Sequence, residues 1–285
     1  MVLRGQIELN IYISIAIHST SKTLMPGSVP EALQLPRIRA TLQRMEDTIV
    51  FYLIERGQYA LNAKIYEPGA FSELAENKHW DRTWLEWVLK ELESSYAKLG
   101  RWFAPDEYPY TPVQELPAPV LTPMKHRQLL HPHRINVTPR IYEFYTREIV
   151  PRITANDGTT VDYNYGSSAV CDCEVLGALS RRIHYGMFVS ESKFLANPAA
   201  FIPHIRSRNR AALEGLITKP EVERILLNRI KQKAEVYGQD LDSAATAAGG
   251  VQQRRKIDSD VVVALYEKYV IPLTKVVEVD YLLER

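Results

Sequence analysis

The sequence predicts an all-α protein built as a single multi-helix domain, and two observations support this prediction. Apolar residues recur at the three- and four-residue steps of a helix in several segments, whereas the strict alternation typical of strands is scarce. The 285 residues are 46% hydrophobic and 24% charged, which is the composition of a globular chain with a sizeable core.

The first two helices are predicted before residue 100. One ends at Gly57, and its apolar stripe consists of Ile38, Leu42, Met45, Ile49 and Leu53. The other is predicted to be capped by Asp81 and to end near Gly100. Its apolar face consists of Trp84, Leu85, Val88 and Leu92.

The middle of the chain is rich in proline. Eight of the 17 prolines fall between Pro105 and Pro139, so we expect an extended connector with at most short helices. Thr138 followed by Pro139 is typical of a helix start, with threonine as N-cap and proline at the first helical position. A helix is therefore predicted over Arg140–Ile153.

The C-terminal half predicts three further helical segments. One runs from Ser168 to about Ala196, and a second covers Glu221–Tyr237 before Gly238. Gln239–Lys256 is interpreted as a mobile loop because it is rich in Ala, Gly and Asp. Asp258 is predicted to cap the last helical turns, which continue past Tyr266 to Leu283.

The N-terminal residues look different from the rest of the chain. Leu9–Ile17 is apolar and follows Arg4, as in the hydrophobic region of a signal peptide, but Asn10 interrupts it and no clear cleavage site follows. We interpret residues 1–30 as a flexible tail and 31–285 as the helical domain. A cytoplasmic protein is expected, with secretion as the alternative.

Charge and cysteine content exclude several classes of function. With 35 Lys+Arg and 34 Asp+Glu, the net charge of +1 gives no general reason to bind nucleic acid or an anionic membrane. No apolar run reaches the roughly 18 residues of a membrane span. Cys171 and Cys173 lie too close for an ordinary disulfide and have no neighbouring metal ligands, so we expect two small residues in a reducing compartment.

Two cations suggest an anion site. Arg182 and Lys193 are 11 residues apart, which on one helix is three turns plus about 20°. Both side chains would leave the same face, about 16 Å apart along the axis, and could converge on one anion. The alternative is that both are solvated cations on an exposed face.

Two further pairs raise the same question. Thr274 and Glu278 lie on one face of a helix in an apolar setting, where burial would raise the pKa of Glu278 and favour its protonated form. Arg39 lies in the first helix, and Glu46, seven residues later, could orient a neighbouring arginine. For Glu278 the alternative is a solvent-facing side chain, and for Arg39 and Glu46 an ordinary surface ion pair.

Four segments together resemble a known family. They are LPRIRATLQRMEDTIVFYLIER, LSRRIHYGMFVSESKF, PEVERILLNRIKQKAEVYG and VIPLTKVVEVDYLL. In order and spacing they resemble the eukaryotic chorismate mutases of the all-helical AroQ class, over roughly residues 35–285. The resemblance implies conversion of chorismate to prephenate by an intramolecular [3,3] rearrangement, in phenylalanine and tyrosine synthesis, without nucleophile, metal or cofactor.

The resemblance also implies roles for particular residues. Arg39 and Arg182 match the arginines that bind the two substrate carboxylates, to which a guanidinium donates bidentately. Lys193 matches the lysine at the ether oxygen, and Glu278 matches the second group there. An ionised Glu278 would repel the developing negative charge, so the neutral acid is expected.

Three more positions follow from the same resemblance. Thr274 lies beside Glu278 in the matched motif, near a substrate carboxylate. Glu223 matches the carboxylate that accepts a hydrogen bond from the ring hydroxyl. Lys219 stands where some members have Asn, and we leave it out of the catalytic set.

Regulation is also implied by the resemblance. Relatives of this size are homodimers that tyrosine inhibits and tryptophan activates at an interface site. The segment YNYGSSAV matches one side of that site and suggests Asn164, Gly166 and Ser167 as effector contacts. From the facing subunit, Arg101 matches one of two arginines of fungal members.

The sequence departs from that fungal pattern at two positions and leaves two other functions open. Gly100 stands in place of the second arginine, and Asp258 replaces a threonine. One alternative is a helical binding or regulatory protein that has kept the fold and lost the reaction. The other is a secreted mutase that diverts a partner's chorismate.

Overall fold

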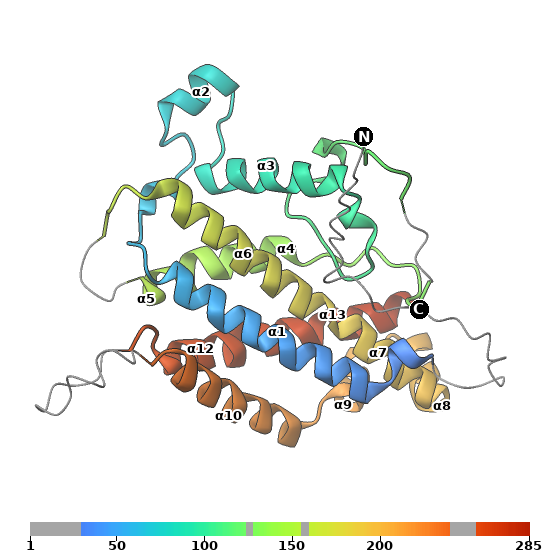
Figure 1. The fold of residues 1–285 in the computed structure, drawn as a ribbon. Coiled ribbons are helices and arrows are strands. Elements are labelled where there is room, and N and C mark those ends of the chain that lie inside the picture. Colours follow the sequence, from blue (N-terminus) through green and yellow to red (C-terminus); the bar gives the residue numbers. More distant parts are fainter. Residues whose placement is uncertain (1–29, 124–127, 155–159, 240–254) are drawn as a thin grey trace, which may run out of the picture.

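A computed structural model describes residues 30–123, 128–154, 160–239 and 255–285 as a helical protein (Figure 1). Within these ranges no strand is formed, and Gln239 pairs with Arg255 in an isolated antiparallel bridge. The prediction of an all-α fold is therefore confirmed for this part of the chain. The tail predicted over residues 1–30 and most of the loop predicted over residues 239–256 lie outside the described residues.

Two long helices lie side by side through the centre of the molecule (Figure 1). Helix α1 covers Leu35–Arg56 and ends at Gly57, as its apolar stripe predicts. It packs along α6, Tyr165–His184, whose inner face is equally apolar. Helix α13, Ile271–Glu284, also packs against α6.

Helix α3 covers Trp84–Lys98 and lies on the opposite side of α6 from α13 (Figure 1). The predicted cap, Asp81, is wrong: Thr83 is the N-cap, and its hydroxyl accepts from the backbone N–H of Glu86. The Glu86 carboxylate accepts the N–H of Thr83 in return, at 2.9 Å. This reciprocal pair satisfies two N–H groups, which is why the N-cap lies two residues after Asp81.

The proline-rich connector is extended, as predicted, with one short 3-10 turn at Val113–Glu115 among its described residues. A buried carboxylate fixes it to α3. Glu93 accepts the backbone N–H groups of Tyr110 and Thr111, both at 2.7 Å. Earlier in the chain, before α3, the short helix α2, Ser72–Lys78, projects from the body of the molecule (Figure 1).

Prolines reshape two helices by the same mechanism. Helix α4, Thr138–Phe144, passes into the π-helical turn η5, Tyr145–Ile149, and then α5, Val150–Ile153. Pro151 follows η5 and has no N–H to donate, so the wider turn avoids a clash between the proline ring and the preceding carbonyl. The predicted N-cap, Thr138, is wrong by one residue, because Val137 is the N-cap and Thr138 is the first helical residue.

The same arrangement recurs near the C-terminus. Helix α12, Ser259–Leu265, passes through the π-helical turn η7, Tyr266–Val270, into α13, which carries Pro272 in its first turn. Asp258 is the N-cap of α12, and its side chain accepts the N–H of Asp260 at 2.8 Å, as predicted.

The long helix predicted from Ser168 to Ala196 is two helices. Helix α6 ends at His184, and α7, Gly186–Ala196, follows after the single residue Tyr185. Arg182 and Lys193 therefore lie on different helices, and the predicted separation along one straight axis does not apply.

Helices α8, Pro198–Arg206, and α9, Arg210–Ile217, escaped prediction because both are short. They form a second hydrophobic cluster with α13, made of Phe201, Leu213, Ile217, Val279 and Leu282. Helix α10, Pro220–Tyr237, begins one residue before the predicted start and is capped by Gly238, as expected.

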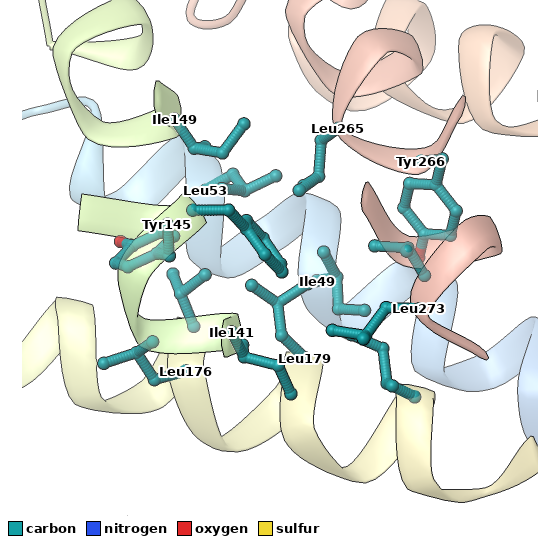
Figure 2. Close-up of a cluster of buried hydrophobic side chains, with 14 of the residues drawn as sticks. Ile49, Leu53, Ile141, Tyr145, Ile149, Leu176, Leu179, Leu265, Tyr266 and Leu273 are labelled. Atoms are coloured by element: carbon teal, nitrogen blue, oxygen red, sulfur yellow. The ribbon is translucent and has the colours of Figure 1, made fainter. Parts of the chain in front are cut away.

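The main core fills the space between α1, α4, α6 and η7 (Figure 2). Its largest contributors are buried aliphatic and tyrosine side chains from these elements and from η5, α12 and α13. Those labelled in Figure 2 are Ile49, Leu53, Ile141, Tyr145, Ile149, Leu176, Leu179, Leu265, Tyr266 and Leu273. Burial of each of these ten or so side chains contributes roughly 1.5–3 kcal/mol to stability. Together they offset part of the conformational entropy that the chain loses on folding.

Cys171 and Cys173 are free and partly buried. No group of three or more metal-ligating side chains occurs in the described part of the chain. None of its helices combines the length and apolarity needed to cross a bilayer.

Candidate active site

A carboxylate buried among cations marks the candidate site. Glu278 of α13 is 8% exposed. Burial raises the pKa of its carboxyl group to about 7, although the nearby charges of Lys193, Arg182 and Lys275 oppose this shift. The prediction that Glu278 is buried rather than solvent-facing is confirmed, and near neutral pH it exists in both protonated and ionised forms.

Arg182 of α6 and Lys193 of α7 both act electrostatically on this carboxylate. Arg182 is 4% exposed, so neither cation is the freely solvated surface group of the alternative interpretation. Lys193 donates a hydrogen bond from Nζ to the backbone carbonyl of Ile217. Burial lowers the pKa of Lys193, which Glu278 partly counters and which Lys219 and Arg39 reinforce.

Other predicted residues surround this centre. Arg39 lies on an exposed part of α1, and Lys219 is the exposed residue before α10. Both are close enough to act electrostatically on Lys193. Thr274 is 8% exposed, one helical turn before Glu278, and its hydroxyl donates to the carbonyl of Val270 at 2.6 Å.

Glu223 lies in the first turn of α10 and has a partner that the sequence did not suggest. Lys275 of α13 forms an ion pair with it, with Nζ 2.9 Å from Oε1. Both side chains are about one quarter exposed, so the pair joins α10 to α13 at the edge of the site. It also places the Glu223 carboxylate within electrostatic range of Glu278 and Lys193.

Glu46 does orient an arginine, but one that sequence reasoning missed. The fully buried Glu46 carboxylate accepts two hydrogen bonds from Arg229 of α10, at 2.7 and 2.8 Å. Lys233 approaches the same carboxylate at 3.2 Å. The surface ion pair of the alternative is thereby excluded. The i, i+4 spacing of Arg229 and Lys233 places both cations on one face of α10, but it does not identify Glu46 as their partner.

A glycine brings the two helices of the site together. A Cβ atom on Gly186 would lie 2.9 Å from Cγ2 of Thr274 and 3.0 Å from Cγ of Glu278. Real Cβ atoms do not approach so closely, so α7 can lie this near α13 only with glycine at this position. This residue, too, was not singled out in the sequence.

Three buried side-chain polar atoms have no hydrogen-bond partner in the described structure: Arg182 Nε, Thr218 Oγ1 and Tyr266 Oη. Arg182 is electrostatically close to both Glu278 and Tyr266, and Thr218 follows the carbonyl that binds Lys193. An unpartnered buried donor costs about 1–3 kcal/mol, so such groups gather where a ligand completes the hydrogen bonds.

The arrangement can bind a small dianion. Arg39, Arg182 and Lys193 supply positive charge and N–H donors, and a protonated Glu278 supplies an O–H donor beside Lys193. Such donors held in a water-poor setting stabilise negative charge that develops on an oxygen atom. The set contains cations and carboxyl groups rather than an activated hydroxyl or thiol.

The residues predicted to bind an effector lie elsewhere. Asn164, Gly166 and Ser167 are exposed at the start of α6. Their loop is fixed from behind: Asp162 accepts the N–H of Asn164 at 2.8 Å and the side-chain amide of Asn62 at 2.7 Å. The helix start therefore presents ordered backbone N–H groups to the surface.

Arg101 is at the other end of α6. It pairs with Glu107 at 3.2 Å, and Glu107 in turn lies 3.8 Å from Arg181. From Asn164 to Arg181 is about 25 Å along a helix, so Arg101 does not meet Asn164 within one chain. The preceding Gly100 has φ of +75°, a backbone conformation that an arginine rarely adopts.

Arg101 also lines a cavity of about 730 Å³ between α1, α3 and α6. Its wall combines cations, carboxylates and aromatic rings, and Tyr96 and Trp102 both lie under the Arg101 guanidinium. Val170 and Gly177 line it from the exposed face of α6. This cavity is separate from the group of residues around Glu278.

A family model described as "Chorismate mutase type II" matches residues 164–279. A chorismate mutase of Schizosaccharomyces pombe is 42% identical over 257 residues, covering 90% of this chain and 98% of the relative. The chloroplastic chorismate mutase 1 of Arabidopsis thaliana is 38% identical over 263 residues, covering 90% of this chain and 75% of the relative.

Solved structures agree with the sequence comparison. The chorismate mutase of Candida albicans in complex with L-Trp superposes with a TM-score of 0.80 and 39% identity, covering 89% of this chain and 92% of that one. AtCM1 with tyrosine bound in its allosteric site superposes with a TM-score of 0.75 and 38% identity, covering 90% and 98%.

Proposed function

Because the chain belongs to the chorismate mutase family, we propose that the residues around Glu278 are where it converts chorismate to prephenate. The activity itself, an isomerisation that serves phenylalanine and tyrosine synthesis, follows from about 40% identity over most of the chain to named chorismate mutases. The observation that supports the site is the buried Glu278 between Arg182 and Lys193.

Arg182 and Arg39 bind the two substrate carboxylates. Arg182 has a buried Nε without a partner, which suits a bidentate hydrogen bond to a carboxylate. Arg39 is exposed and closes the site from α1. Two cations on opposite helices hold the dianion in the folded conformation that an intramolecular rearrangement requires.

Lys193 and Glu278 act at the ether oxygen. As the carbon–oxygen bond breaks, negative charge develops on this oxygen, and both groups donate a hydrogen bond to it. Glu278 donates only while it is protonated, for which its raised pKa of about 7 is suitable. Thr274 binds a carboxylate beside it, and Glu223, which forms an ion pair with Lys275, accepts a hydrogen bond from the ring hydroxyl.

Tyrosine as an inhibitor and tryptophan as an activator bind at an interface between two copies of this chain. Asn164, Gly166 and Ser167 contribute from one copy and Arg101 from the other. The support is geometric, because Arg101 and Asn164 lie at opposite ends of α6 and a two-fold related copy can bring them together. The exposed Val170 and the cavity beside Arg101 offer a surface for that copy. We place the homodimer in the cytoplasm.

One assay tests reaction and regulation together. Chorismate is followed by its ultraviolet absorbance with purified protein, alone, with tyrosine and with tryptophan. Loss of chorismate that tyrosine slows and tryptophan accelerates supports both proposals. Loss without a response leaves the active site and implicates Gly100 and Asp258 in missing regulation. A folded protein that converts nothing would instead be a binding protein that has kept the fold.

Two simpler measurements test the remaining parts. Light scattering of the purified chain reports its oligomeric state, and a monomer at micromolar concentration would contradict the shared effector site. The mature N-terminus, read by mass spectrometry from the source cells, separates the cytoplasmic protein from a secreted one. Removal of the residues up to Ile17 would support the secreted mutase.

A further inference from the structure

Lys193 closes the end of a helix other than its own. Its ammonium donates to the carbonyl of Ile217, the last residue of α9. The final carbonyls of a helix have no partner within it, and the negative end of the helix dipole attracts a cation. A lysine ammonium has three N–H donors, so this bond fixes one and directs the other two. The α9 terminus thus decides where Lys193 can donate.

The side chain of Ile217 is anchored separately from its carbonyl. It is 4% exposed within the second hydrophobic cluster, where it packs with Leu213 of α9 and with Val279 and Leu282 of α13. Val279 directly follows Glu278 in α13. The cluster that holds the end of α9 therefore also holds the segment of α13 that carries Glu278.

A third contact links α7 to the same place. The hydroxyl of Ser190, which is fully buried, donates to the backbone carbonyl of Glu278 at 3.1 Å. Ser190 lies one helical turn before Lys193 on α7. The relative position of Lys193 and Glu278 is thus set from two sides, by Ser190 and by Ile217.

We infer that Ile217 is a positioning residue for the rearrangement: its side chain fixes the end of α9 in the second cluster, and its carbonyl aims the Lys193 ammonium at the substrate oxygen beside Glu278. This rests on the role proposed above for Lys193. Helix α9 has eight residues and is too short to be stable alone, so its end stays in place only through this packing. A shift of about 1 Å in a reacting group lowers a rate by up to roughly 100-fold.

The test is a double-mutant cycle between Ile217 and Lys193. The variants are I217A, K193M, the double variant, and I217V, which keeps most of the side chain. The matched control is I65A, because Ile65 is also fully buried but lies in the main core, in the 3-10 turn Ala63–Tyr66. Rates are measured well below each denaturation midpoint, so that every variant is folded.

The expected result is that I217A lowers kcat roughly tenfold with little change in KM, while I217V and I65A stay within about twofold. In the K193M background, I217A lowers the remaining rate by less than about twofold, because the group it positions is gone. Full additivity of the two losses, or an equal loss in I65A, would overturn the inference. If K193M alone keeps the wild-type rate, the proposed role of Lys193 fails instead.

Discussion

Among the described residues, two groups of buried charged side chains, one around Arg56 and Asp172 and one around Arg182 and Glu278, are built in opposite ways. Arg56 and Asp172 have no exposed side-chain surface and are joined at 2.8 Å. The other N–H groups of Arg56 donate to the carbonyls of Ala60 and Leu61, and Asp172 also accepts the hydroxyl of Tyr145 at 2.8 Å. Around Glu278, by contrast, Arg182 keeps a buried Nε without a partner.

In our proposal the first group is structural and the second binds substrate. A buried charge is tolerated when every donor and acceptor is satisfied, and Arg56 then ties the end of α1 to α6. Arg182 is buried with an unpartnered Nε, and burial raises the pKa of the nearby Glu278. We propose that this second group binds a ligand at the expense of folding stability.

The largest expected effect comes from Arg182. R182M should lower kcat/KM by roughly 10³-fold, because a carboxylate loses its bidentate partner. Its free energy of unfolding should stay within about 1 kcal/mol of wild type, since the replaced group was not fully satisfied. Steady-state kinetics and urea unfolding of the same preparation measure both. A large loss of stability would make Arg182 a structural residue like Arg56.

The complementary experiment replaces Arg56. R56M leaves the Asp172 carboxylate buried without its cation and should cost about 3–5 kcal/mol in the free energy of unfolding. At a temperature where the variant is folded, its kcat/KM should stay within about twofold. Urea unfolding followed by circular dichroism, with kinetics alongside, decides the matter. A folded but inactive R56M would contradict the purely structural role of Arg56 and Asp172.

The pH dependence sharpens the comparison further. With a Glu278 pKa of about 7, kcat/KM should be about tenfold lower at pH 8 than below pH 6, because the neutral acid is the active form. E278Q cannot ionise and should have a flat profile over the same range. An unchanged alkaline limb in E278Q would assign that limb to another group.

Glu278 should also make stability depend on pH. The folded state keeps the Glu278 proton between pH 4.5 and about 7, where the unfolded chain releases it. The free energy of unfolding therefore falls as pH rises through this window, by an amount on the order of 3 kcal/mol. In E278Q this fall should be smaller. Urea titrations at pH 4.5, 6 and 7.5 compare the two proteins.

A substitution at Gly186 tests how closely α7 must pack against Thr274 and Glu278. G186A places a Cβ 2.9 Å from Thr274 and 3.0 Å from Glu278, so α7 and α13 must separate. We expect a roughly tenfold lower kcat/KM and a loss of about 1–3 kcal/mol in stability. The matched control is G215A on the exposed face of α9, where a Cβ meets nothing within 4 Å. It should keep the rate and gain up to about 1 kcal/mol.

The smallest effect on the basal rate is expected at Arg101. R101A should abolish the response to tyrosine and tryptophan and keep the rate without effector within about twofold, since Arg101 is remote from Glu278. The control is R147A. Arg147 lies on the π-helical turn η5 and forms an exposed ion pair with Glu143, so its replacement should keep both the rate and the response. A loss of basal activity in R101A would indicate that Arg101 is structural.

The amino-acid sequence by itself determined the fold class and most helix positions. The apolar stripe of α1 and the Asp258 cap are local signals, since they depend on residues within a few positions of one another. The family motifs likewise marked Arg182, Lys193 and Glu278, which the structure brings together. The cap of α3 was missed although its signal is also local, because Thr83 with Glu86 three residues later is a capping-box pattern that the prediction of Asp81 overlooked.

Only the tertiary structure decided how the site is assembled. Gly186 packs closely on α13, which lies nearly a hundred residues away in the chain. Arg229 meets Glu46, and Lys193 meets the carbonyl of Ile217, through contacts between helices that no local pattern encodes. Burial raises the pKa of Glu278 for the same reason, because desolvation depends on every element packed around a group rather than on its neighbours in sequence.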